Sequence, residues 1–214
     1  MLPFTADVLY LLFEQYNDAI WPAQIIAYGL GLAAVILTLK PVPGGDRFIS
    51  ALLAVAWAWV GVVYHFTHFA AINFAAPAYG VVFVLQALLF AWTGVIRGRI
   101  AFRFRADVFG WTGLGLVVFA IAGYPLLEWL AGRGWPSTPL FGVAPGPTTM
   151  VTIGLLLLTE SRTPLHLVVI PVLWSLASGA MAWLLTIPQG LAFPAAGIGG
   201  LGLIVWKRRR QTQE

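Results

Sequence analysis

The sequence contains no cysteine, so disulfides, thiolate metal sites, iron–sulfur clusters and cysteine nucleophiles are all excluded. Charge is scarce as well: 9% of the 214 residues are charged, against about 25% in a typical soluble domain. With 60% hydrophobic residues and a mean hydropathy of +0.87, the chain has too few polar side chains to cover a soluble surface. These deficits exclude a soluble globular protein, a disordered chain and a nucleic-acid-binding protein. They leave a polytopic membrane protein.

Long apolar stretches are abundant. A membrane-spanning helix needs roughly 20 apolar residues, and seven stretches qualify. We predict spans at residues 20–39, 48–69, 76–96, 108–130, 147–160, 164–187 and 188–206. The sequence therefore predicts an all-α membrane protein, a seven-transmembrane helix bundle that forms a single domain over residues 1–214. The fifth stretch is short, so a bundle of six spans is the main alternative.

The two ends of the chain differ from the predicted spans. In residues 4–19 apolar side chains recur at helical spacing, which predicts a short interfacial amphipathic helix with Thr5 as its N-cap. Residues 207–214 carry consecutive basic side chains and are predicted to form a basic cytoplasmic tail. The seven predicted transmembrane helices fill residues 20–206 between these segments.

Lys and Arg fall almost entirely on one side of the predicted bundle. If the N-terminus is outside, only Arg133 of the 12 lies in an outer segment, and the other eleven are cytoplasmic. Because cytoplasmic loops retain Lys and Arg, this pattern predicts an outer N-terminus and a cytoplasmic C-terminus. Removing the fifth span would place Lys207–Arg210 opposite the Arg97–Arg105 cluster, so the pattern favours seven spans.

Tyr64, His65, His68 and Asn73 are predicted at the outer end of the second span. In an α-helix, His65 and His68 would share a face, because residues three apart are neighbours. Imidazoles at that level could bind a ligand or a metal, or carry protons. A metal site would need a third ligand from elsewhere. The alternative is that headgroups and water simply solvate these histidines.

Acidic and amide side chains are also predicted at the outer level. Glu14, Asn17 and Asp18 precede the first span, and Glu128 lies late in the fourth within an apolar run. A carboxylate near the membrane usually turns inward and is paired. Arg133 is five residues further on and could reach Glu128, so Glu128 is either a structural partner of Arg133 or part of a ligand site.

Two further polar features lie within the predicted spans. Pro147, Thr148 and Thr149 open the fifth span and predict a donor-rich helix N-terminus that could attract anions or carbonyl oxygens; ordinary capping is the alternative. Gln24 and Gln86 lie inside the first and third spans. Such amides either hydrogen-bond between helices or line a polar path.

No cofactor is predicted. Retinal requires a lysine within a span, and the two lysines, Lys40 and Lys207, both lie at the cytoplasmic boundary. A bis-histidine haem requires two histidines at one depth. His166 is predicted at the opposite end of the bundle from His65 and His68.

The order and spacing of several short motifs resemble a family of bacterial integral membrane proteins of unknown function. These motifs are Tyr16-Asn17, Trp21-Pro22-Ala23-Gln24, Tyr64-His65, Ile72-Asn73, Gly123-Tyr124-Pro125, Pro139-Leu140-Phe141-Gly142, Pro147-Thr148-Thr149, Gly154-Leu155-Leu156-Leu157, Ile170-Pro171 and Trp174. The resemblance implies a multi-pass protein of the bacterial inner (plasma) membrane. It implies no activity, cofactor or catalytic residue.

We therefore expect a protein that binds or transports a small polar solute or ion through an outward-opening pocket. A non-catalytic accessory subunit of a larger membrane complex is the alternative, and an intramembrane enzyme ranks third. The expected partners are membrane lipids and partner subunits, not nucleic acid. The residues expected to bind ligand are Glu14, Asn17, Asp18, Gln24, Tyr64, His65, His68, Asn73, Glu128, Thr148 and Thr149. Of the predicted outer features, the Tyr16–Gln24 segment, His65, Asn73, Glu128 and Thr148 are expected to converge in one vestibule covered by the loop 131–147.

Overall fold

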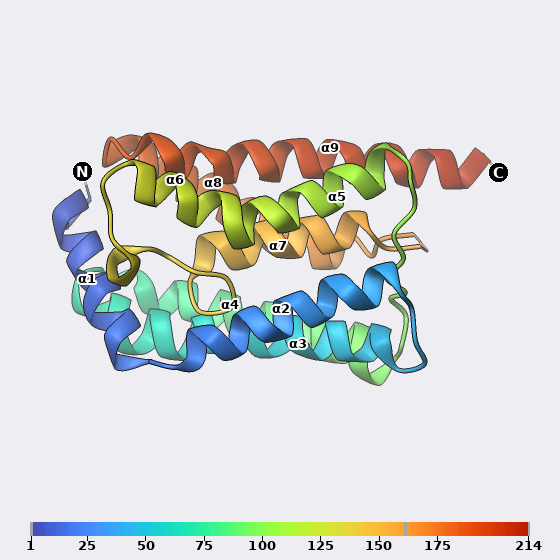
Figure 1. Ribbon diagram of the computed structural model, residues 1–214, viewed down its shortest axis with the longest axis horizontal. Helices are drawn as coiled ribbons and strands as arrows, with labels where there is room; N and C mark the ends of the chain where they lie inside the picture. Colours follow the sequence, from blue (N-terminus) through green and yellow to red (C-terminus); the bar gives the residue numbers. More distant parts are fainter. Residues whose placement is uncertain (1, 161, 214) are drawn as a thin grey trace.

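The computed structural model describes residues 2–160 and 162–213. Within these residues the chain has no β-strand, and its one isolated antiparallel bridge joins Phe102 and Thr159. The long helices run side by side in an elongated bundle (Figure 1). The elements are α1 (Ala6–Ala19), α2 (Ala23–Leu39), α3 (Gly45–Trp59), η1 (Val60–His68), η2 (Phe69–Ala71), α4 (Ala76–Phe90), η3 (Ala91–Ile96), α5 (Val108–Val118), η4 (Phe119–Gly123), α6 (Tyr124–Leu130), η5 (Trp135–Ser137), α7 (Pro145–Leu157), α8 (His166–Leu184), η6 (Pro188–Leu191) and α9 (Ala192–Gln213).

The two ends of the bundle differ in charge. One end, which we call the α1 end, holds α1 and the long connection between α6 and α7 (Figure 1). The other end, the basic end, holds the connections 40–44 and 97–107, the α7–α8 connection and the end of α9. The eleven Lys and Arg residues predicted to be cytoplasmic lie in or beside these segments, whereas Arg133 lies at the α1 end. The structure therefore segregates basic side chains as the sequence pattern predicted.

Five helices are long and apolar enough to cross a membrane, and a sixth span results if α1 and α2, which meet at 87°, count as one bent span. Two of the five, Ala76–Ile96 and Val108–Leu130, coincide with the third and fourth predicted spans. Seven separate spans are not confirmed. The first predicted span is the 17-residue α2, and the fifth is the 13-residue α7, both shorter than a complete membrane crossing requires.

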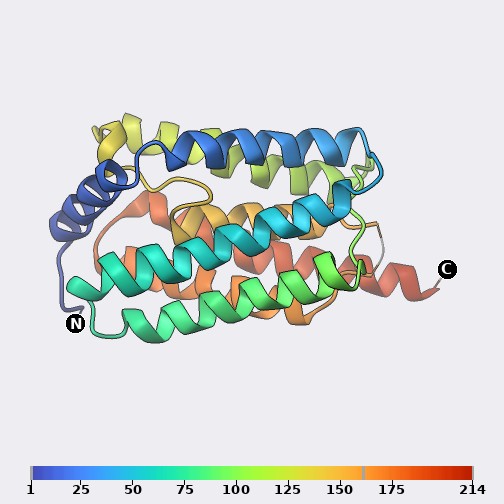
Figure 2. The same ribbon diagram turned by 90° about the horizontal axis from the view of Figure 1, so that it is seen from below.

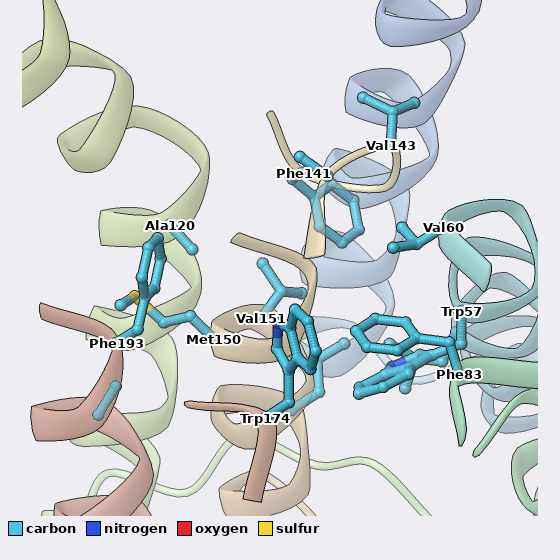
Figure 3. Close-up of a cluster of buried hydrophobic side chains, with 14 of the residues drawn as sticks. Trp57, Val60, Phe83, Ala120, Phe141, Val143, Met150, Val151, Trp174 and Phe193 are labelled. Carbon is cyan, nitrogen blue, oxygen red and sulfur yellow. The ribbon is translucent and has the colours of Figure 1, made fainter. Parts of the chain in front are cut away.

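The short α7 lies at the centre of the bundle. All 13 of its residues are buried. Figure 3 shows Met150 of α7 directed towards Ala120 and Phe193 on one side, with Trp174 on the other. A helix that is buried all round and this short is a core helix, which other helices must enclose.

The backbones of α5 and α7 are in direct contact. A Cβ atom added to Gly113 would lie 2.7 Å from the Gly154 carbonyl oxygen, and one added to Gly154 would lie equally close to the Gly113 carbonyl oxygen. Small residues allow this approach, as in other closely packed membrane helices. Sequence reasoning did not identify this pair.

The connection before α7 descends into the bundle as non-helical chain. Residues 140–144 are all buried, and Figures 1 and 2 show the chain entering between the helices to reach the start of α7. Several of its backbone groups are hydrogen-bonded: Tyr16 donates its hydroxyl to the Val143 carbonyl (2.7 Å), Gly142 N–H donates to Thr148 Oγ1 (2.9 Å) and Ala144 N–H donates to the Leu140 carbonyl (2.9 Å). Irregular backbone at membrane depth is tolerated where it is buried in protein. The loop 131–147, which was expected to cover the outer end of the bundle, is therefore partly inserted into it.

Side chains hold the elements together at the basic end. Lys207 Nζ donates to the carbonyl oxygens of Leu157 (2.7 Å), the last residue of α7, and of Thr159, two residues further on. Asp46 accepts from Arg103 Nη1 at 2.7 Å and from the Phe102 N–H at 2.8 Å. The predicted basic tail is thus helical as far as Gln213 and begins with a packed lysine; residue 214 lies outside the described residues.

Candidate functional site

A cavity of about 90 Å³ lies at the α1 end, bordered by α1, η1, α6, the start of α7, α8 and α9. Its lining is apolar and unusually rich in rings, which we call the aromatic cage. The rings are those of Tyr10, Phe13, Tyr64, Phe69, Tyr124, Trp174 and Phe193. Glu128 is the one ionisable acid among the lining residues.

Glu128 is held by neighbours from two elements. Its side chain is 1% exposed. Tyr124, one helical turn earlier, donates its hydroxyl to Oε1 at 2.8 Å, and Gln189 of η6 donates Nε2 to Oε2 at 3.1 Å. Both donors fix the carboxylate against the cavity wall, and each oxygen keeps a lone pair for a further partner.

Arg133 connects Glu128 with α1. Its Nη1 lies 3.6 Å from Glu128 Oε2, and its guanidinium carbon lies 3.5 Å from the centre of the Tyr10 ring. Burial lowers the pKa of Arg133, and the negative charge of Asp7 acts in the opposite direction. The pairing that the five-residue spacing suggested is therefore present. At 3.6 Å it is an ion pair without a hydrogen bond.

The two histidines point to different surroundings. His65 is fully buried among rings, including those of Tyr79, Phe83 and Trp174, and neither ring nitrogen has a hydrogen-bond partner. His68 Nδ1 lies 2.8 Å from the Val63 carbonyl oxygen. The expectation of a shared face is wrong, because η1 is a π-helix and its wider turn separates residues three apart.

Among the described residues no group of three His, Cys, Asp or Glu side chains could hold a metal ion. The hydrogen-bond partners of Glu128 are Tyr124 and Gln189, and neither ring nitrogen of His65 is bonded to it.

The amide side chains around the α1–α2 elbow form hydrogen bonds with backbone carbonyl groups. Asn17 Nδ2 donates to the carbonyl oxygens of Pro136 (2.6 Å) and Thr138 (2.9 Å), and Gln24 Nε2 donates to the Asn17 carbonyl at 2.6 Å. These bonds attach the loop before α7 to α1. Glu14 and Asp18 are exposed on α1, away from the cavity lining.

The remaining predicted residues also make local contacts. Asn73 Oδ1 accepts the Ala75 N–H (3.0 Å) at the start of α4, and Gln86 Nε2 donates to the Leu167 carbonyl (3.0 Å) on α8. Thr148 accepts from Gly142, and Thr149 Oγ1 has no partner among the described residues.

The N-terminus of α7 is not donor-rich as predicted. Pro145 and Pro147 carry no N–H, and the Thr148 N–H donates to the Ala144 carbonyl.

Two of the eleven predicted residues, Tyr64 and Glu128, line the cavity. Sequence reasoning missed Tyr10, Tyr124 and Gln189 as contributors. Tyr124 could have been found, because residues four apart in a helix are neighbours. Tyr10 and Gln189 come from opposite ends of the chain. Only the tertiary structure brings Tyr10 to the cavity and Gln189 to Glu128. A ligand-binding role stays a prediction for all eleven residues.

Residues 6–214 match a family described as "Family of unknown function (DUF6064)". The chain belongs to this family. The match covers nearly the whole chain and confirms the resemblance to a family of unknown function that the motifs indicated. No curated protein and no solved structure matches the chain.

Proposed function

We propose that this family member is an integral membrane protein of the bacterial inner membrane that binds a small organic cation, such as an alkylammonium ion, in the cavity at the α1 end. The α1 end faces outward and the basic end faces the cytoplasm. The segregation of basic side chains supports this orientation. The exposed apolar side chains along the long helices support the membrane location.

The observation that carries the proposal is the combination of one buried carboxylate with seven aromatic rings around a single cavity. Aromatic faces attract cations through their ring quadrupoles, and cages of such rings recognise quaternary ammonium groups. Glu128 supplies the opposite charge at the wall. A neutral polar solute would gain little from an almost wholly apolar lining, and an anion would be repelled by Glu128.

The volume restricts the occupant. A cavity of about 90 Å³ is smaller than the roughly 150 Å³ engineered cavity that binds benzene. The occupant is therefore a compact ion with only a few carbon atoms.

The guanidinium of Arg133 competes with the proposed ligand for the cation site beside Glu128. Its guanidinium stacks on Tyr10, one ring of the cage, and stands 3.6 Å from Glu128. A bound cation would take over both contacts, the ring face and the carboxylate. Because like charges repel, Arg133 and a bound cation oppose each other, so removing the guanidinium should favour binding.

The geometry favours binding over passage through the bundle. Gln24 and Gln86, which could have lined a polar path, both donate to backbone carbonyls and connect segments of the chain. A non-catalytic subunit role is the alternative if the cavity takes no cation.

The test uses the full chain purified in detergent, with tetramethylammonium as the probe and tert-butanol as a neutral probe of similar size. We expect tetramethylammonium to bind and tert-butanol not to bind, as measured by isothermal titration calorimetry. Glu128→Gln should weaken tetramethylammonium binding about 30-fold or more, because removing one partner of a buried charge pair costs about 2–5 kcal/mol. Arg133→Gln should strengthen it.

Glu14→Gln is the matched control, because Glu14 is an exposed carboxylate on α1 outside the cavity lining. This variant should bind tetramethylammonium like the natural chain. Equal affinity of the natural chain and Glu128→Gln would contradict the proposal, as would equal binding of the two probes.

A further inference from the structure

A second hollow, about 360 Å³ in volume, lies on the flank of the bundle between α2 and α3. We call it the lateral groove. It is lined by apolar side chains of both helices, and residues 141–143 of the inserted loop close its floor. The indole N–H of Trp59, its one side-chain polar group, already donates to the Tyr16 hydroxyl at 3.0 Å. The groove therefore offers an occupant only hydrocarbon contacts.

The shape of the groove follows from the path of the chain. The connection 40–44 joins α2 and α3 at the basic end, and the two helices diverge towards the α1 end (Figure 2). Ile26 and Val55 on its rim are each 62% exposed, so the groove is open along the flank. The groove opens sideways, and we call its end nearest α1, where the backbones of α2 and α3 lie furthest apart, the wide end.

We propose that the lateral groove binds one acyl chain of a phospholipid that has an ammonium headgroup and belongs to the leaflet at the α1 end. The groove is continuous with the exposed apolar surface of α2, which includes Ile25, Leu32 and Ile36. At this depth in a bilayer, acyl chains are the surrounding solvent. The volume is more than twice the roughly 150 Å³ that accommodates benzene, so several methylene groups fit.

A carboxylate near the wide end selects the headgroup. Asp18 lies in the last turn of α1, five residues before Ala23 on the groove wall; it is exposed and forms no ion pair within the described residues. Trp21, in the same elbow, is 56% exposed, as expected of a ring at headgroup level. A carboxylate there attracts an ethanolamine ammonium group and repels a headgroup with net negative charge.

The inference needs the membrane location proposed above but not the cation site, because the groove and the aromatic cage share no lining residue. Native mass spectrometry of the full chain tests it by counting retained phospholipids. Phosphatidylethanolamine and phosphatidylglycerol are then titrated onto delipidated protein. We expect one retained phospholipid, with phosphatidylethanolamine preferred.

Ala51→Phe places a ring inside the groove and should weaken phosphatidylethanolamine binding about tenfold, equivalent to losing contact with about two methylene groups. Ala23→Leu at the wide end is a milder second variant with the same expected direction. Ala177→Phe, on the exposed face of α8, is the matched control and should retain the lipid.

Three results would overturn the inference. They are unchanged phosphatidylethanolamine binding in both folded groove variants, tighter binding of phosphatidylglycerol than of phosphatidylethanolamine, and a dimer of the natural chain that Ala51→Phe dissociates. If the natural chain binds phosphatidylethanolamine as expected but does not bind tetramethylammonium, the result would count against the cation site alone.

Discussion

At the basic end, Lys207 and Asp46 hold carbonyl and N–H groups of neighbouring segments. In the half of the bundle nearer the α1 end, His65, Trp174 and Thr149 have buried polar atoms without partners among the described residues. A buried polar group without a hydrogen bond costs about 1–3 kcal/mol. Gln211 Oε1, at the basic end, is also without a partner among the described residues, but more of these atoms lie towards the α1 end. The α1 end, which holds the cavity, therefore gives up more stability, as functional sites commonly do.

The largest decrease in the free energy of unfolding should come from a substitution that separates α5 and α7. In Gly154→Val the new Cβ would meet the Gly113 carbonyl oxygen at 2.7 Å, so the two helices must move apart. We expect the free energy of unfolding to fall by about 3 kcal/mol, at the upper end of typical overpacking costs. Thermal unfolding in detergent, followed by circular dichroism, measures it. Gly115→Val is the control, since no atom lies within 4 Å of its added Cβ; equal effects would show that the contact is unimportant.

A smaller decrease in the free energy of unfolding should follow when Lys207 at the basic end is replaced. Lys207→Met removes the donor to the Leu157 and Thr159 carbonyls and should lower the free energy of unfolding by about 2 kcal/mol, as expected for hydrogen bonds to a charged group. The same unfolding measurement applies. Arg209→Met, at an exposed position two residues on, should change it little. An unaffected Lys207→Met would remove the contrast between the two ends.

The smallest effect, and the most informative about the α1 end, concerns His65. His65→Leu replaces an imidazole that makes no hydrogen bond by an apolar side chain of similar size. We expect unchanged stability or a gain of up to about 1 kcal/mol, because no bond is lost. A clear loss in the melting temperature would mean that the imidazole has a partner in solution, and the two ends would then be more alike than the geometry indicates.

Much of the fold could be predicted from composition and periodicity. The predicted spans 76–96 and 108–130 coincide with helices, and Thr5 caps α1 as expected. These succeed because long apolar runs and N-caps are local signals. The span at α7 was harder to predict, since its 13 residues and buried non-helical approach depend on the helices around it.

The site was only half predictable. The spacing of Glu128 and Arg133 identified a real ion pair. The prediction that His65 and His68 share a helix face assumed an α-helix, and no local sequence signal indicated the π-helix η1. The contribution of Tyr10 arises when α1 folds against the bundle end, which is a tertiary event that no local pattern encodes.

The central position of α7 also bears on how the chain enters a bilayer. A helix of 13 residues is about 20 Å long at 1.5 Å per residue, short of a hydrocarbon core about 30 Å thick. The helix α7 therefore cannot insert into the bilayer as an independent transmembrane segment. Two of the helices that enclose it, α8 and α9, follow it in the chain and are synthesised later. Core closure therefore waits for the C-terminal helix, and a nascent chain ending before α9 leaves α7 without part of its wall.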